Sequence, residues 1–83
     1  MKYKLIGDMT NDPADSVIPK TDGAGATLVH VVASGATELI QTRGGQVVGR
    51  IYIPANGSID LSKEHDDAIT CPNSFCTPIA YQA

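Results

Sequence analysis

The fold is decided by the stretch Gln46-Val47-Val48-Gly49-Arg50-Ile51-Tyr52-Ile53. Alternate side chains of a strand lie on one face, so the odd-numbered residues from Val47 to Ile53 fall together and Val48, Arg50 and Tyr52 fall opposite them. No run in the chain keeps the i, i+3, i+4, i+7 apolar spacing of a helix over three turns. We therefore predict a strand over 46–53, with Val47, Gly49, Ile51 and Ile53 on a buried face.

Further strand signals lie on both sides of this stretch. Residues 38–42 form a candidate strand, and Arg43-Gly44-Gly45 after it predicts a tight turn and a hairpin with 46–53. Residues 27–33 are nearly all apolar, as expected for a central strand covered on both faces. Pro54-Ala55-Asn56-Gly57 predicts a turn. Later strands are expected over 58–62, 68–71 and 75–82, with Pro78 at an edge, a bulge or a strand start.

Composition agrees with this pattern. Val, Ile and Thr supply 21 of the 83 residues, whereas Leu and Met supply 6. β-Branched side chains pack well on a pleated sheet and lose rotamer freedom in a helix. A chain of this length has room for one core. We predict a single all-β domain over 1–83, a small β-sandwich or jelly-roll-like barrel of about six to eight short strands.

Residues 8–26 have a different composition. Asp, Asn, Pro and Gly dominate the segment, and Val17 and Ile18 are its short apolar pair. Loops of this length without structure are uncommon in compact domains and are often functional. We predict an extended N-terminal loop or arm over 8–26.

Charge and hydropathy exclude two classes of partner. The net charge is −3 and the six basic residues are scattered, which argues against nucleic-acid binding. No apolar stretch approaches the roughly 20 residues that span a bilayer, so no membrane partner is expected. The start of the chain lacks the apolar region of a signal peptide, which predicts synthesis in the cytoplasm.

Two cysteines and two histidines are the residues with metal or redox chemistry. Cys71 and Cys76 enclose four residues, a spacing compatible with a disulfide or with two small buried thiols. Reduced thiols are favoured in the producing cell, and oxidation after release stays open. His30 and His65 are 35 positions apart and supply no second close ligand pair, so no metal site is expected.

No catalytic motif is present. The chain has no G-x-S-x-G elbow, and its glycine pairs lack phosphate-binding spacing. Asp66 and Asp67 are adjacent and would point to opposite faces of a strand. We expect His30 to be a satisfied core or interface histidine and His65 to lie in a solvated turn. A small core leaves little room for a pocket, and we predict that the protein is not an enzyme and uses no cofactor.

The C-terminal half resembles a known group of proteins. Residues 57–70, Gly-Ser-Ile-Asp-Leu-Ser-Lys-Glu-His-Asp-Asp-Ala-Ile-Thr, and 76–81, Cys-Thr-Pro-Ile-Ala-Tyr, are similar to the ending of small virion structural proteins of tailed bacteriophages, of the head decoration, cement or knob type. The matching positions are framework residues: Ile59, Leu61, Lys63, Asp67, Ile69, Pro78, Ile79 and Tyr81.

The resemblance implies a non-catalytic subunit located in the virion. Its expected partner is the major capsid protein or another virion protein, and we expect a homo-oligomer, a trimer by this likeness. The predicted function is to decorate and stabilise the capsid shell through the 8–26 arm and one exposed sheet edge, where backbone hydrogen bonds give affinity. The expected contact residues of the arm are Asp8, Asn11, Asp12, Val17, Ile18 and Lys20. The alternative is a fibre or knob-type module that recognises a host surface glycan or protein. Tyr3, Tyr52, Phe75 and Tyr81 are the aromatic residues available for such a site.

Overall fold

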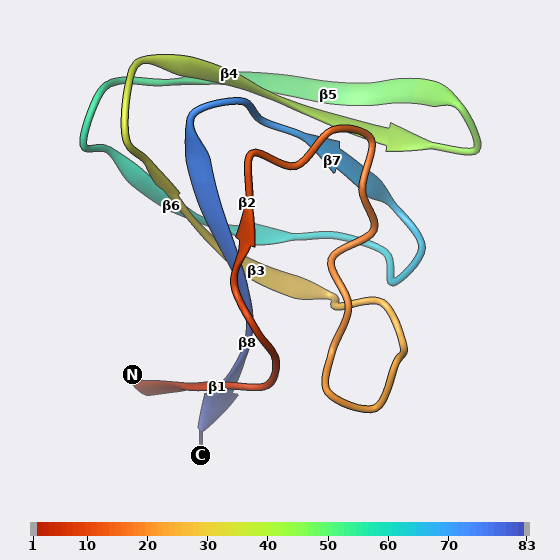
Figure 1. Cartoon of the computed structure of the whole chain (residues 1–83). Helices are drawn as coiled ribbons and strands as arrows, with labels where there is room; N and C mark the ends of the chain where they lie inside the picture. The colour runs from red at the N-terminus through yellow and green to blue at the C-terminus, as the bar shows by residue number, and fades with distance from the viewer. Residues whose placement is uncertain (1, 83) are drawn as a thin grey trace.

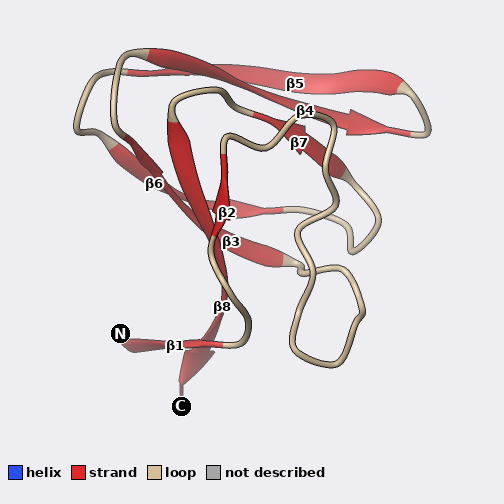
Figure 2. Ribbon diagram, in the orientation of Figure 1, coloured by secondary structure: helices blue, strands red, loops and turns tan. Residues whose placement is uncertain are grey.

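The computed structural model describes residues 2–82, and in this range it consists of strands, turns and loops without a helix (Figure 2). The strands are β1 (Lys2–Leu5), β2 (Thr10–Asn11), β3 (Leu28–Ala33), β4 (Thr37–Arg43), β5 (Gln46–Ile53), β6 (Ser58–Ser62), β7 (Ala68–Thr70) and β8 (Ser74–Gln82). The prediction of an all-β fold is confirmed.

The strands form two antiparallel sheets packed against each other (Figure 1). The five-stranded sheet has the order β1-β8-β3-β6, with β2 also paired to β8, and the three-stranded sheet has the order β5-β4-β7. An isolated bridge between Ser16 and Ile69 extends the smaller sheet beside β7. The strand pairs are nested along the chain: β4 pairs with β5, β3 with β6, residue 16 with β7, and β1 with β8. This nested pairing across two sheets is that of a jelly roll.

The core lies between the inner faces of the two sheets. Val29, Val31 and Ala33 of β3 point into it, together with residues such as Leu39 and Ile53 from the smaller sheet. The alternate residues of β3, including His30, are half-buried on the other face. The expectation that 27–33 is covered on both faces is therefore wrong, because no strand within residues 2–82 packs on the outer face of the five-stranded sheet.

β4 and β5 form the predicted hairpin. Gly44 and Gly45 connect them with φ angles of 60° and 83°, the left-handed conformation that a type I′ turn requires. The predicted buried face of β5 holds only for Ile53, since Val47 is 48% and Ile51 46% exposed. For Ile51 the reason is that β5 is the outermost strand of its sheet, and its hairpin projects beyond the other strands (Figure 1). Val47 lies beyond a β-bulge, where the register with β4 shifts between Gln41 and Thr42, so it no longer shares the face of Ile51 and Ile53.

The predicted turn at 54–57 is also present. Gly57 N donates to Pro54 O at 2.9 Å, and Asn56 has a φ of 64°. This turn leads from β5 to β6, which lie in different sheets. It therefore closes one end of the sandwich rather than a hairpin.

Pro78 lies inside β8, where it is paired with Val29 of β3. Its carbonyl accepts a hydrogen bond from Ile6 N at 3.1 Å, on the side of β8 that faces the N-terminal strands. The nitrogen and carbonyl of one strand residue point to the same side, so the missing N–H of Pro78 faces the gap between β1 and β2. A proline is tolerated at this interior position because no ladder bond is required there.

The 8–26 segment is a long loop tied to the body and not a free arm. Asp12 N donates to Ser74 O at 2.9 Å, Ser16 and Ile69 exchange two hydrogen bonds, and Ala26 N donates to Ile18 O. Ile18 and Ala26 belong to the core cluster with no exposed surface. The prediction that Ile18 is a contact residue is therefore wrong, since a small sandwich needs its apolar side chain inside.

Candidate functional site

The outer face of the five-stranded sheet gathers most of the aromatic residues. Cross-strand partners share a face, and the register places Tyr3 opposite Tyr81, and His30 opposite Thr77 and Asp60. We define the aromatic face by these side chains and their neighbours: Tyr3, Leu5, His30, Asp60, Phe75, Thr77 and Tyr81. It contains three of the four aromatic residues of the chain.

The aromatic face is open to solvent although it is apolar. Leu5 is 69% and Tyr81 54% exposed, and Tyr3 and Phe75 are also exposed. Large apolar side chains grouped on one surface are typical of interaction sites, and aromatic residues are enriched at the centres of interfaces. The face can therefore bury apolar area against a partner.

Part of this face is already ordered. The Tyr3 ring stacks on the His30 ring, with centroids 5.5 Å apart and an interplanar angle of 24°. Because β8 lies between β1 and β3, Tyr3 reaches across β8 to make this contact. Ile79, opposite Leu5 on β8, is 1% exposed yet lies outside the core cluster between the sheets. The stacked Tyr3 and the buried Ile79 are therefore already ordered in the free protein. This order reduces the side-chain conformational entropy that is lost when a partner binds the aromatic face.

His30 and Asp60 form a polar pair on this face. His30 Nδ1 lies 2.6 Å from Asp60 Oδ1 across β3 and β6. An ionised carboxylate only accepts hydrogen bonds, so His30 Nδ1 is the donor. The pair fixes the imidazole ring, and His30 Nε2 has no hydrogen-bond partner among residues 2–82. A bound molecule can therefore form a hydrogen bond with Nε2.

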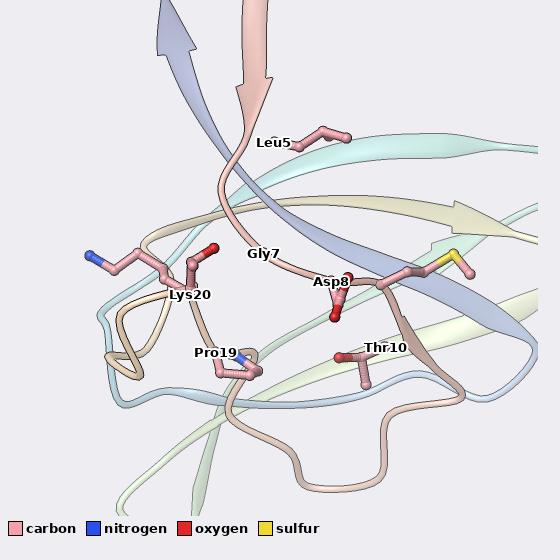
Figure 3. A pocket seen from close by; sticks show the side chains of 8 residues that line it. Leu5, Gly7, Asp8, Thr10, Pro19 and Lys20 are labelled. Atoms are coloured by element: carbon pink, nitrogen blue, oxygen red, sulfur yellow. The ribbon is translucent and has the colours of Figure 1, made fainter.

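A second hollow is formed by the loop segment. It is an open groove of about 570 Å³ between residues 5–10 and 19–21, and Asp8 and Lys20 are among the lining residues (Figure 3). The Lys20 ammonium points away from Asp8, and it lies 3.9 Å from Asp22. The groove therefore brings together two of the predicted arm residues, Asp8 and Lys20, but they do not form an ion pair with each other.

The other predicted arm residues are dispersed. Asn11 lies in β2, Asp12 is exposed beside Ser74, and Val17 is 44% exposed on the far side of the loop from buried Ile18. Asp12 and Asp15 have positive φ angles, which short polar side chains tolerate. The loop residues therefore do not form one continuous contact surface.

A third hollow lies between the edges of the two sheets. It is a groove of about 400 Å³ between β5 and β6, and its apolar lining comes from Leu39, Ile51, Ile59 and Leu61. Alternation places Ile51 on the predicted buried face of 46–53 but does not indicate that the sandwich is open beside it.

Asp67 is the most strongly held carboxylate of the described chain. It is fully buried and accepts hydrogen bonds from Arg43, Gln41 Nε2 and Glu64 N. The hydrogen bonds from Arg43 hold the pKa of Asp67 well below its usual range. Lys63 is buried nearby and donates to the Asp67 carbonyl at 3.0 Å; desolvation lowers its pKa. These groups are mutually satisfied, so they serve the fold.

Cys71 and Cys76 are free thiols in the core, the second of the two states left open by their spacing. Burial raises the pKa of Cys76 to about 11. A thiol that stays protonated and is shielded from solvent is a poor nucleophile and metal ligand. Within residues 2–82, no group of three or more His, Cys, Asp or Glu side chains is arranged to hold a metal ion. His65 lies exposed in a turn between Lys63 and Asp67.

In the described range, no helix is long and apolar enough to cross a membrane. A scan against protein-family models and searches of curated proteins and solved structures find no match to this chain.

Proposed function

We propose that this chain is a virion structural subunit that binds the major capsid protein, or another virion protein, through its aromatic face. The observation that carries the proposal is that three of the four aromatic residues lie exposed on one sheet face, with Tyr3 and Tyr81 as cross-strand neighbours. The virion setting is implied by the resemblance of residues 57–70 and 76–81 to small phage structural proteins. The subunit acts by binding and bridging, without catalysis, after synthesis in the host cytoplasm.

The site of contact differs from the one expected of an arm. The 8–26 loop is held to β7 and β8 by backbone hydrogen bonds and gives Ile18 to the core. An anchored loop cannot extend to a neighbouring chain without partial unfolding. The aromatic face needs no such rearrangement, because its side chains already stand on paired strands.

The test is capsid occupancy of point variants, because deletion of the first 20 residues would remove Ile18 from the core. Tyr81→Ser and Phe75→Ser remove exposed rings of the aromatic face. Val17→Ser is the matched control, since its side chain is about as exposed as that of Tyr3 but lies on the loop. Co-sedimentation with capsids assembled from the major capsid protein should show at least a roughly tenfold loss of affinity for the ring variants. Unchanged binding of both, with loss for Val17→Ser, would contradict the proposal.

The second candidate function is a knob-type module that recognises a host surface glycan or protein. One observation favours it: the His30–Asp60 pair stands beside Tyr3 on the same face, combining polar groups with aromatic rings. Sugar rings stack on such platforms and hydrogen-bond to adjacent polar groups. A glycan array probed with the protein distinguishes the two functions, since Tyr81-dependent binding to a defined oligosaccharide would favour this candidate.

We further propose that the subunit is a homo-oligomer, with a trimer as the expected form. A small core that is marginal alone is stabilised by burial against other copies. Light scattering of the purified protein measures this directly: a trimer has three times the 8.7 kDa of the chain.

A further inference from the structure

The groove between β5 and β6 is bordered by two strand edges. β5 is the last strand of the three-stranded sheet and β6 the last strand of the five-stranded sheet. An edge strand presents unpaired N–H and C=O groups along one side. Between these edges lie the exposed Ile51 and the half-buried Ile59 and Leu61, which line the groove with Leu39. Backbone hydrogen-bonding groups and apolar side chains therefore lie side by side.

Gly49, in the middle of β5, also lines this groove. Its φ is not positive, and a Cβ built on it would meet nothing within 4 Å. Gly49 adjoins a β-bulge, because Gln41 pairs with Gly49 and Thr42 with Val47, which leaves Val48 without a partner on β4. A glycine inside a strand marks such a bulge or a place where another backbone approaches closely. Because Gly49 has no side chain, the groove beside it is open to an approaching chain.

Beyond its bulge at Val48, the β5 edge is regular and carries Arg50 as its charged residue. β1, an edge strand of the larger sheet, carries Lys2 and Lys4, and lysines discourage pairing with other chains. β5 instead exposes Val47, Val48 and Ile51. The same molecule thus blocks one edge with charge and leaves another available.

Arg50 gives this edge a charge preference. It is the charged residue of β5, and its Nη1 lies 3.5 Å from Glu38 Oε1, a long contact between two side chains that are each more than half exposed. Such a loose surface pair contributes little to stability and leaves the guanidinium accessible. An acidic group on an added strand can reach it.

We propose that an extended segment of a partner protein adds to the β5 edge as a further strand. Alternate apolar side chains of this segment enter the groove beside Gly49 and Ile51, and an acidic side chain on its other face pairs with Arg50. Main-chain hydrogen bonds supply affinity in this mode of binding, and the alternate side chains supply selectivity. The inference does not rest on the aromatic face, which lies on the outer side of the other sheet.

The experiment uses the full chain labelled with ¹⁵N and three capped synthetic peptides. The first is Thr-Val-Thr-Val-Glu-Val-Thr-Val, the second has Lys in place of Glu, and the third has Pro in place of its two central Val residues, which removes backbone donors. Amide shift changes are followed by NMR during titration. The Gly49→Val variant places a side chain in the groove, and Val17→Ser serves as a control outside it.

We expect shift changes concentrated in 46–53 and 58–62 with the Glu peptide, at least about fivefold weaker binding of the Lys peptide, and no such changes with the Pro peptide. Gly49→Val should abolish the effect while keeping the remaining spectrum of the folded protein, and Val17→Ser should retain it. Absence of shifts with the Glu peptide, equal binding of the Pro peptide, or full binding to Gly49→Val would each overturn the proposal. Shifts in 46–53 that depend on protein concentration alone would also overturn it, since the occupant would then be a second copy of this chain.

Discussion

The guanidinium of Arg43 holds the carboxylate of Asp67 with two hydrogen bonds, Nε to Oδ1 at 2.8 Å and Nη2 to Oδ2 at 2.9 Å. Arg43 ends β4, and Asp67 directly precedes β7, the strand paired with β4. Gln41 Nε2 and Glu64 N complete the set of donors. This two-pronged contact fixes the loop before β7 to the turn end of the β4–β5 hairpin, next to Gly44.

Asp67→Asn is expected to destabilise the fold strongly. The substitution removes the charge that holds Arg43 and leaves a buried amide among groups that are all donors. We expect the melting temperature to fall by about 10 °C or more. Asp66→Asn is the matched control, because Asp66 is exposed and its loss should change the melting temperature little. Thermal unfolding followed by circular dichroism measures both.

The contact between Arg43 and Asp67 makes the free energy of unfolding depend on pH in the acidic range. The native pKa of Asp67 lies below its ordinary value of about 4, so the unfolded chain binds more protons between these two values. The stabilisation is fully present above about pH 4 and is lost as the pH falls through the native pKa. The difference in unfolding free energy between wild type and Asp67→Asn should therefore shrink below about pH 4. A difference that stays constant in urea titrations down to pH 2 would show that the charge of Asp67 has no part in it.

Cys76 makes the free energy of unfolding fall as the pH rises in the alkaline range. Burial raises its pKa to about 11, above the ordinary value of a thiol, so the native state keeps its proton longer than the unfolded chain. Its contribution is fully present below about pH 8.5 and is lost as the pH rises to about 11. Lys63, whose pKa is lowered by burial, acts in the other direction, so the comparison must be made with Cys76→Ala. The wild type should lose stability relative to this variant between pH 8.5 and 11 in urea titrations.

Much of the fold follows from local sequence chemistry, and the exceptions have physical reasons. Gly44 and Gly45 predict their turn because only a positive φ closes a two-residue hairpin there. The alternation fails at Val47 because a β-bulge shifts the register between Gln41 and Thr42. The exposure of Ile51 could not be predicted, because alternation shows which residues share a face but not whether another sheet lies over it. That depends on the position of β5 at a sheet edge, which long-range pairing decides.

The candidate site was harder to predict than the fold. His30 and Asp60 are 30 residues apart, and only the register between β3 and β6 places them side by side. Asp66 and Asp67 are adjacent and look alike in the sequence, and residue type alone does not indicate which of them is buried. Their exposure differs because Asp67 alone faces Arg43. In both cases a contact between residues far apart in the sequence determines the role of the side chain, and residue type alone does not predict that contact.

The adjacent pair Val17 and Ile18 tests whether the 8–26 loop is part of the core. Ile18→Ala should destabilise the protein by about 2–5 kcal/mol, since the removed atoms are fully buried and leave a cavity. Val17→Ala removes a partly exposed side chain and should cost less than about 1 kcal/mol. Urea unfolding of the two variants gives both values. Equal, small effects would mean that the loop can detach from the body and serve as an arm.

Gly25 and Gly49 are two glycines with opposite surroundings, and alanine at each is expected to act in opposite directions. A Cβ at Gly25 would lie 1.6 Å from the backbone oxygen of His65, so the loop and the turn before Asp67 would have to separate. We expect Gly25→Ala to destabilise by about 1–3 kcal/mol or more, the range of overpacking. Gly49→Ala meets nothing within 4 Å and reduces the entropy of the unfolded chain, which should stabilise by about 0.4–1 kcal/mol. Urea unfolding of both variants decides the matter: destabilisation by Gly49→Ala would show that the isolated fold itself requires this glycine, and the space over β5 would then need no incoming chain to explain it.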